Sequence, residues 1–266
     1  MQPVIKWCGS KRTSVKEILS YFPCDYQTYY EPFVGGGSIA YAVMPMKGVC
    51  GDICSPLIDL WNEIKERPLQ LSDAYKERWT RLQQNGHEEY YSIRRNFNET
   101  HAPEDFLFLS RTCTNGLIRF NLNGEFNNSL HITRDGIKPE TLRKIIFDWS
   151  MRIQNIEFVC GDYRKTTEGI TDKDFIYLDP PYYHTKGMYY GKIDYEDLFG
   201  FIESLNNRQI RYALSFDGVR GNENRIVNVP KSLYKRHVLI HSGNSSFNRV
   251  ITKKKVEVYE SLYLNY

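Results

Sequence analysis

One stretch of this 266-residue sequence decides its fold: Phe175-Ile176-Tyr177-Leu178-Asp179-Pro180-Pro181-Tyr182-Tyr183. It begins with a run of apolar, aromatic and β-branched residues, which stops abruptly at an acid and two prolines. Such a run is typical of a buried strand that ends at the carboxyl edge of a sheet. Open α/β sheets bind their ligands at that edge, so the stretch predicts an α/β fold with a site beside Asp179.

The residues that end this strand also predict a chemistry. Each proline fixes φ and lacks an N–H, and Pro181 keeps Pro180 out of the helical region. The Asp179 carboxylate and the Pro180 carbonyl therefore become two rigid acceptors, between which a planar amino group would fit. Tyr182 supplies a flat face on which a nucleobase could stack, worth about 1–3 kcal/mol per base. The alternative is a plain turn after a core strand, since prolines are common in turns.

The composition predicts one large α/β domain that carries an inserted lobe. The sequence has no apolar run of signal-peptide length at its start and no segment near the ~20 apolar residues of a membrane span, so we expect a cytoplasmic protein without a membrane partner. Its six cysteines form no Cys-x-x-Cys pair, and no His cluster has zinc spacing. We therefore expect neither a disulfide framework nor a metal.

The positive charge of the chain is unevenly distributed. The net charge of +3 is too small to indicate nucleic-acid binding by itself. However, residues 1–16 and 225–255 contain several Lys and Arg residues and no acid, and the second segment ends in Lys253, Lys254 and Lys255. These segments predict a localised positive face. The alternative is a solvated surface.

A glycine turn and three acids predict a nucleoside site. A strand over residues 26–33 leads through Val34-Gly35-Gly36-Gly37-Ser38 into a helix over 38–44, and glycines let a backbone approach a ligand closely. The following strand, 48–51, ends at Asp52, where an acid can accept hydrogen bonds from ribose hydroxyls. Later strands end at Asp162 and Asp179, so we expect one site. An ordinary strand-to-helix turn is the alternative for the glycines.

The alternation of strands and helices stops between residues 68 and 150, which predicts an inserted helical lobe. Helices are expected over 69–84, 88–97, 103–113 and 139–153. The loop 114–128 is rich in Asn, Arg and Gly mixed with aromatics, the residue types that contact base edges and phosphates. A β-hairpin with Asn-Gly turn chemistry is the alternative. The sheet resumes at 157–160, and a helix over 195–206 precedes further strands at 210–216, 234–241 and 256–263.

These motifs together resemble the Dam-type (D12 class, alpha group) S-adenosylmethionine-dependent DNA adenine-N6 methyltransferases. The matching motifs cover nearly the whole chain: Lys6-Trp7-Cys8-Gly9-Ser10-Lys11, Glu31-Pro32-Phe33-Val34-Gly35-Gly36-Gly37, Gly51-Asp52-Ile53, Ser110 to Asn121 and Asp179-Pro180-Pro181-Tyr182. The resemblance implies a Rossmann-like, seven-stranded class I methyltransferase sheet. Its catalytic domain would comprise residues 1–66 and 151–266, and the target-recognition lobe residues 67–150.

The resemblance also implies the ligands and their residues. The substrate would be a flipped-out adenine in double-stranded DNA, held at its N6 amine by the catalytic Asp179, Pro180 and Tyr182, without a metal. The residues expected to bind S-adenosylmethionine are Trp7, Lys11, Phe33, Gly35, Gly37, Asp52, Asp162, Tyr163 and Asp179. The residues expected to bind DNA are Asn115, Arg119, Asn121, Arg134, Lys253, Lys254 and Lys255. A cognate restriction endonuclease is a candidate partner.

Three questions stay open at the level of the sequence. The stretch 127–136 does not match that of enzymes which read GATC, so the target sequence is not predicted. Arg119 is expected to read a base, because Arg paired to guanine is the commonest specific major-groove contact, with a phosphate contact or a salt bridge as the alternative. The alternatives to DNA methylation are methyl transfer to RNA or to a protein side-chain amide, where relatives typically carry Asn in place of Asp179, and a catalytically inactive DNA-binding relative.

Overall fold

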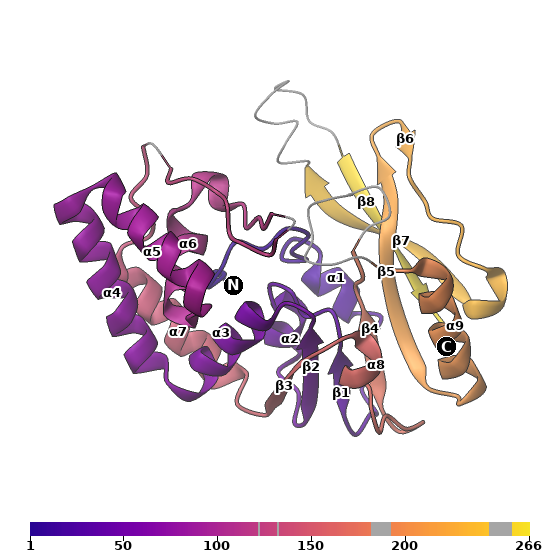
Figure 1. Cartoon of the computed structure of the whole chain (residues 1–266). Helices are drawn as coiled ribbons and strands as arrows, with labels where there is room; N and C mark the ends of the chain where they lie inside the picture. The colour runs from indigo at the N-terminus through magenta and orange to yellow at the C-terminus, as the bar shows by residue number, and fades with distance from the viewer. Residues whose placement is uncertain (122, 132, 182–192, 245–256) are drawn as a thin grey trace.

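The computed structural model describes residues 1–121, 123–131, 133–181, 193–244 and 257–266. One sheet runs through the molecule in the order β3-β2-β1-β4-β5-β8-β7, with β6 paired to β5 outside this path (Figure 1). The strands are β1 Tyr29–Glu31, β2 Gly48–Asp52, β3 Ile156–Cys160, β4 Phe175–Leu178, β5 Arg211–Arg220, β6 Glu223–Asn224, β7 Arg236–Asn244 and β8 Glu257–Leu264. The expected α/β fold is confirmed, and the two-residue β6 adds an eighth strand to the seven that were predicted.

The order of the strands creates the place for a site. Strands β1 to β5 are parallel, whereas β8 is antiparallel to both β5 and β7. The chain moves outward from β1 through β2 to β3 and then returns to β4 on the other side of β1. This reversal between β1 and β4 is a topological switch point, and the carboxyl ends of the strands there form the crevice in which α/β sheets bind ligands.

Strand β4 is covered on both faces, as its continuous apolar run predicts. Phe175 and Tyr177 pack into a core cluster with helices of the N-terminal half, whereas Ile176 and Leu178 pack with Leu198 of helix α9. Neighbouring residues of a strand point to opposite faces, so these two clusters lie on the two sides of the sheet. The short and fully buried strand therefore holds the residue that follows it, Asp179, rigidly.

The predicted helices are all present. Those beside the sheet are α2 Ser38–Val43, α3 Ser55–Glu66 and α9 Tyr195–Asn207, together with two short ones that the sequence did not predict, α1 Val15–Leu19 and α8 Tyr163–Thr166. The lobe contains α4 Pro68–Asn85, α5 His87–Thr100, α6 Pro103–Thr112 and α7 Pro139–Arg152. A proline occupies the first turn of α3, α4, α6 and α7, where its missing N–H costs no helical hydrogen bond.

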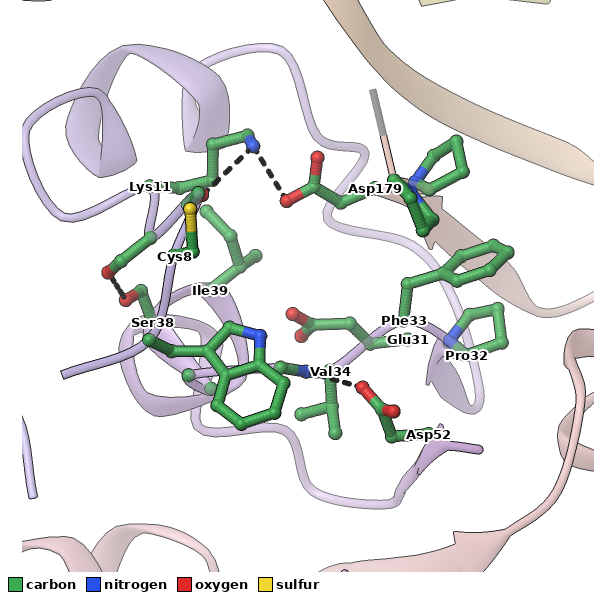
Figure 2. Close-up of a pocket in the computed structure, with 18 of the residues that line it drawn as sticks. Cys8, Lys11, Glu31, Pro32, Phe33, Val34, Ser38, Ile39, Asp52 and Asp179 are labelled. Atoms are coloured by element: carbon green, nitrogen blue, oxygen red, sulfur yellow. Dashed lines mark hydrogen bonds and ion pairs between the residues drawn. The ribbon is translucent and has the colours of Figure 1, made fainter. Parts of the chain in front are cut away.

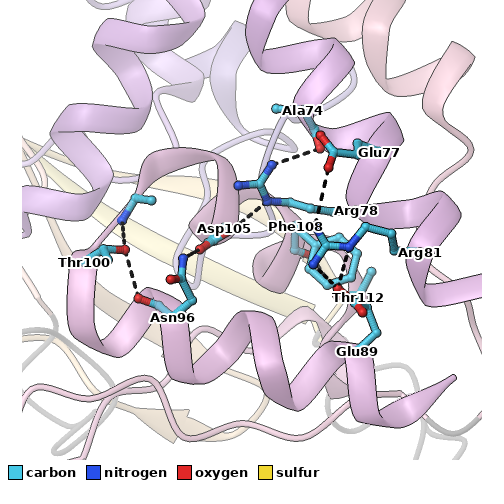
Figure 3. A network of polar contacts seen from close by, with 11 residues as sticks. Ala74, Glu77, Arg78, Arg81, Glu89, Asn96, Thr100, Asp105, Phe108 and Thr112 are labelled. Atoms are coloured by element: carbon cyan, nitrogen blue, oxygen red, sulfur yellow. Dashed lines mark hydrogen bonds and ion pairs between the residues drawn. The ribbon is translucent and has the colours of Figure 1, made fainter. Parts of the chain in front are cut away.

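Helices α4 to α7 gather on the side of the molecule away from β5 to β8 (Figure 1). Buried charge fixes their arrangement: Asp105 of α6 accepts hydrogen bonds from Arg78 of α4 at 2.6 Å and from Asn96 of α5 at 2.5 Å (Figure 3). Arg81 of α4 donates to Glu89 of α5 at 2.8 Å. One carboxylate thus ties three helices together, which makes the lobe a defined support for the loop that follows α6.

Helix α7 connects the lobe to the sheet. Its Trp149 stacks on Trp61 of α3 with ring centroids 5.1 Å apart, and both rings lie in the core cluster that also contains Tyr29 of β1. The division after residue 150 falls inside α7, and the two-domain assignment stays a prediction. Within the part of the chain that the structure describes, no helix combines the length and apolar character needed to cross a membrane.

Candidate active site

A pocket lies at the switch point, where the chain leaves β1, β2, β3 and β4 (Figure 2). It encloses about 1010 Å³ of space free of protein atoms, part of it open to solvent. All nine residues predicted to bind the cofactor line it: Trp7, Lys11, Phe33, Gly35, Gly37, Asp52, Asp162, Tyr163 and Asp179. The expectation that three strand-end acids meet at one site is therefore confirmed as a matter of position, while the role of each residue stays a prediction.

The glycine turn is packed tightly from two sides. Gly35 and Gly37 have φ of 45° and 64°, in the left-handed region that favours glycine. A Cβ at Gly35 would come within 2.8 Å of the Trp7 ring, and one at Gly37 within 3.1 Å of Trp149 and Trp61. Trp61 also donates from Nε1 to the Gly35 carbonyl at 3.1 Å. The turn is thus fixed before any ligand enters.

Asp52 fastens this turn to the end of β2. Its Oδ2 accepts from the Gly35 N–H at 3.2 Å and its Oδ1 from the Cys54 N–H at 3.0 Å. Burial raises the pKa of Asp52 to about 6, although these backbone N–H groups oppose the shift. The carboxylate lies on the pocket wall opposite Lys11 and Asp179 (Figure 2). Asp52 therefore has a structural role besides the ribose contact that we predict.

Two aromatic rings form another wall. Phe33 and Tyr163 lie with ring centroids 5.7 Å apart, and the Tyr163 hydroxyl donates to Asp197 of α9 at 2.9 Å. Asp162 precedes α8 and accepts from the N–H groups of Arg164 and Lys165 at 3.1 and 3.0 Å, which is the geometry of a helix N-cap. Asp162 thus lines the pocket and also caps α8. An acid directly before a predicted helix would have indicated this capping role.

Lys11 and Asp179 form a buried ion pair on the opposite side of the pocket. Lys11 Nζ lies 2.7 Å from Asp179 Oδ2, and Nζ also donates to the Gly9 carbonyl at 3.3 Å (Figure 2). Burial raises the pKa of Asp179 to about 6 against the opposing charge of Lys11. Asp179 Oδ1 is shielded from solvent and accepts no hydrogen bond from the residues the structure describes. One oxygen of the carboxylate is therefore available to a ligand in the pocket.

Glu31 is a pocket residue that sequence reasoning missed. It ends β1, is 2 % exposed, and its Oε2 accepts from the Tyr29 hydroxyl at 2.7 Å. Burial raises the pKa of Glu31 to about 8, and the nearby charge of Asp179 adds to the shift. Glu31 points into the pocket between Asp52 and Asp179 (Figure 2). The strand expected over 26–33 spans only Tyr29–Glu31, so Glu31 is a strand-end acid like the other three, which the longer predicted strand concealed.

Two of the predicted DNA-binding residues of the lobe, Arg119 and Asn121, lie on an irregular hairpin. Phe120 and Phe126 form an isolated antiparallel bridge, so the hairpin alternative for this loop is confirmed in part. Asn121 Oδ1 accepts from the backbone N–H of residues 123 and 125, both at 2.9 Å, and its amide donates to the Glu125 carboxylate at 2.7 Å. Its side chain forms the turn, and this local role explains why Asn occupies the position.

The other predicted DNA contacts have different surroundings. Arg119 is exposed, and its Nε donates to Asn127 Oδ1 at 2.8 Å. Asn115 is exposed in a left-handed conformation with φ 58°, and Arg134 is exposed as well. Tyr182 and the lysines at 253–255 lie outside the described residues.

A cationic group at the base of the lobe was not predicted as a unit. Burial lowers the pKa of Lys6, and the nearby charges of Arg111 and Arg134 lower it further. Burial also lowers the pKa of Arg111, whose guanidinium donates to the Pro3 carbonyl at 3.3 Å. The fold thus brings together cations from the N-terminal segment, the end of α6 and the loop before α7. Their separation in the sequence concealed this grouping.

Comparison with known proteins gives consistent matches. The family model for D12 class N6 adenine-specific DNA methyltransferase matches residues 7–258. The Type II methyltransferase M.MjaIII of Methanocaldococcus jannaschii is 26% identical over 100% of this chain and 99% of its own length. The DNA adenine methylase of Escherichia coli K12 is 32% identical over 67% of this chain and 64% of its own length. The Type II methyltransferase M.FokI of Planomicrobium okeanokoites is 26% identical over 98% of this chain, which spans only 43% of that protein.

Proposed function

This chain belongs to the D12 class N6 adenine-specific DNA methyltransferases, and we propose that it transfers a methyl group from S-adenosylmethionine to the N6 amine of a flipped-out adenine in double-stranded DNA. One observation carries the assignment of the chemistry. Asp179 ends a rigid strand at the pocket, directly before two prolines, with one buried oxygen open to a ligand. A carboxylate so placed accepts a hydrogen bond from an amino group.

The residues of the pocket fit the cofactor. Asp52 lies across the pocket from the Lys11–Asp179 pair, which leaves space for an elongated ligand (Figure 2). Phe33 and Tyr163 offer an apolar wall for a purine. In this proposal Asp52 accepts from the ribose hydroxyls, while Trp7 and the backbone of Gly35 close the pocket around the ligand. When bound, the cofactor supplies an electrophilic methyl group on a sulfonium.

Asp179 and the Pro180 carbonyl act on the adenine amine. The lone pair of that amine is conjugated with the ring, so the amine is a poor nucleophile. Hydrogen bonds from its two N–H groups to these acceptors favour a pyramidal nitrogen, whose lone pair would form the new N–C bond as the bond between the methyl group and sulfur breaks and S-adenosylhomocysteine leaves. The N6 nitrogen then carries the positive charge and releases one proton through the Asp179 carboxylate to solvent. Tyr182 stacks on the flipped base in place of its lost neighbours.

The lobe and the basic segments are proposed to bind the duplex. Arg119 reads a base from the exposed loop, supported by Asn115, and Arg134 contacts the backbone beside Lys6. Lys253, Lys254 and Lys255 add phosphate contacts. Two of the relatives named above are type II methyltransferases, which supports a cognate restriction endonuclease as a partner of this chain.

Methyl transfer from tritiated S-adenosylmethionine tests the function. Plasmid DNA is the substrate, total RNA and a protein extract are the controls, and digestion to nucleosides identifies the product. We expect label in N6-methyladenine from DNA. Label in RNA or protein alone, or no incorporation by a protein that binds both S-adenosylhomocysteine and DNA, would contradict the proposal.

A further inference from the structure

Lys11 lies between two carboxylates from distant parts of the chain. Its Nζ is 2.7 Å from Asp179 Oδ2, after β4, and 3.8 Å from Glu260 Oε2, in β8 near the C-terminus. The Lys11 side chain is 3 % exposed, so its ammonium is almost fully removed from water. Burial alone would lower the pKa of Lys11, but the charges of Asp179 and Glu260 outweigh it and keep the ammonium protonated.

Glu260 is a partly buried acid, with its side chain 16 % exposed, and its hydrogen-bonding capacity is not filled. Its Oε2 is shielded from solvent and accepts no hydrogen bond from the described residues, and the same holds for Asp179 Oδ1. On β5, the buried Asp217 lies directly opposite Glu260. Two acids opposite each other in a sheet are less favourable than an apolar or oppositely charged pair. An acid at Glu260 is therefore not a choice that sheet pairing favours.

The ion pair with Lys11 conflicts with the task of Asp179. A carboxylate that is paired with an ammonium is a weaker acceptor and a weaker base than a free one. The adenine amine must use Asp179 during transfer, yet Lys11 cannot leave without exposing an uncompensated buried charge. A second anion within reach of Lys11 resolves this conflict.

We propose that Glu260 is a positioning residue that receives the Lys11 ammonium when the substrate amine engages Asp179. The inference rests on the proposed function. Nζ needs to move only about 1 Å toward Oε2, because 3.8 Å must shorten to an ordinary hydrogen bond of about 2.8 Å. This movement leaves the ammonium paired throughout, and it makes Asp179 a stronger acceptor at the time of methyl transfer.

The other polar groups around Lys11 are less suited to this task. Glu31 already accepts from the Tyr29 hydroxyl, and its pKa of about 8 favours the neutral form at pH 7. The Tyr177 hydroxyl is hydrogen bonded to Ser215 at 2.8 Å, and burial raises its pKa well above the usual range. Among the described residues, Glu260 is the acid that, in addition to Asp179, has a carboxylate oxygen within 4 Å of Lys11 Nζ.

The test compares Glu260→Gln, Glu260→Asp and Glu257→Gln in methyl transfer to plasmid DNA across pH. Glu257→Gln is the matched control, because it removes the same charge from an exposed position of β8. We expect Glu260→Gln to lower kcat at least tenfold while KM for cofactor and DNA changes less than threefold. The acid limb of the pH profile of kcat should move to lower pH in Glu260→Gln, since the Glu260 charge raises the pKa of Asp179. Glu260→Asp should return the limb to its wild-type position and recover part of kcat.

Each outcome decides between the alternatives. Wild-type kcat and pH profile in Glu260→Gln would overturn the proposal, and so would a loss of kcat with an unmoved acid limb. If Glu260→Gln does not fold, Glu260→Asp decides: lowered kcat with normal S-adenosylhomocysteine binding supports the proposal, and wild-type kcat overturns it. An inactive wild-type protein would instead overturn the proposed function, and the role of Glu260 with it.

Discussion

The ring of Trp7 lies so close to Gly35 that a Cβ there would meet its Cδ1 and Nε1 atoms at 2.8 Å. Gly35 also has a positive φ of 45°, so two independent constraints exclude a side chain. We expect Gly35→Ala to destabilise the protein by about 1–3 kcal/mol and to weaken S-adenosylhomocysteine binding at least tenfold. Gly200→Ala is the control, because a Cβ at this position of α9 meets nothing within 4 Å. It should leave binding unchanged; equal effects of both variants on binding would contradict the argument.

Asp179→Asn is expected to reduce methyl transfer below detection while the protein stays folded. The amide keeps the size of the side chain but lacks the charge that holds Lys11 and that, in our proposal, stabilises the reacting amine. Loss of one partner of a buried pair is costly, and since Glu260 lies 3.8 Å from the same ammonium we expect a loss of about 2 kcal/mol in stability. Adding Lys11→Met should recover stability without activity. Transfer within a few-fold of wild type by Asp179→Asn would refute the role of Asp179.

Asp52→Asn should weaken S-adenosylhomocysteine binding by about 1.5–3 kcal/mol, the size of a charge-assisted hydrogen bond. The physical reason is that Asp52 both holds the Gly35 turn and, in our proposal, accepts from the ribose. Asp59→Asn removes an equal charge from an exposed position of α3 and serves as the control. Calorimetry measures both variants. The ribose assignment fails if their dissociation constants are the same.

Glu31 should make stability fall as pH rises. Its pKa is raised from an ordinary value of 4.5 to about 8, so the folded protein holds a proton that the unfolded chain has lost between these values. The free energy of unfolding should therefore decrease by about 1.4 kcal/mol per pH unit between pH 5 and 8 from this group. Glu31→Gln should flatten that slope, whereas Glu157→Gln, at an exposed position of β3, should not. Chemical denaturation at several pH values gives the slopes, and an unaltered slope in Glu31→Gln would exclude this role.

If Arg119 reads a base, Arg119→Ala should cost about 1–3 kcal/mol of transition-state stabilisation on the cognate site. It should also relax the specificity at one base position. Asn127 accepts from Arg119 Nε at 2.8 Å, so Asn127→Ala should have a smaller effect at the same position. Arg95→Ala, on the exposed face of α5, is the control. Rates on cognate DNA and on single-base variants distinguish the outcomes. A uniform decrease over the panel would indicate a phosphate contact instead.

The sequence predicted the residues that line the pocket better than it predicted the charged residues that surround Lys11. The strand-end acids carry a local signal, an acid after an apolar run, and the parallel strands bring them to one edge, whereas Trp7 and Lys11 were expected there only from the family resemblance. Glu260 could not be predicted in this way, because its place beside Lys11 depends on the pairing of β8 with β5. Asn121 is the converse case, because an Asn three residues before Gly124 is a local signal for the turn that its side chain forms.

The stacked rings of Trp149 and Trp61 pack against the glycine turn, so a residue of the lobe supports this turn directly. Trp149 belongs to α7, lies under Gly37, and donates from its indole N–H to the backbone of Gln2 at 2.8 Å. If the lobe tilts when it binds a duplex, as the proposed function would allow, these contacts require Gly37 and the N-terminal segment to move with it. Occupancy of the two proposed ligand sites would then be energetically linked, and by reciprocity the factor by which the duplex raises cofactor affinity would equal the factor by which the cofactor raises duplex affinity.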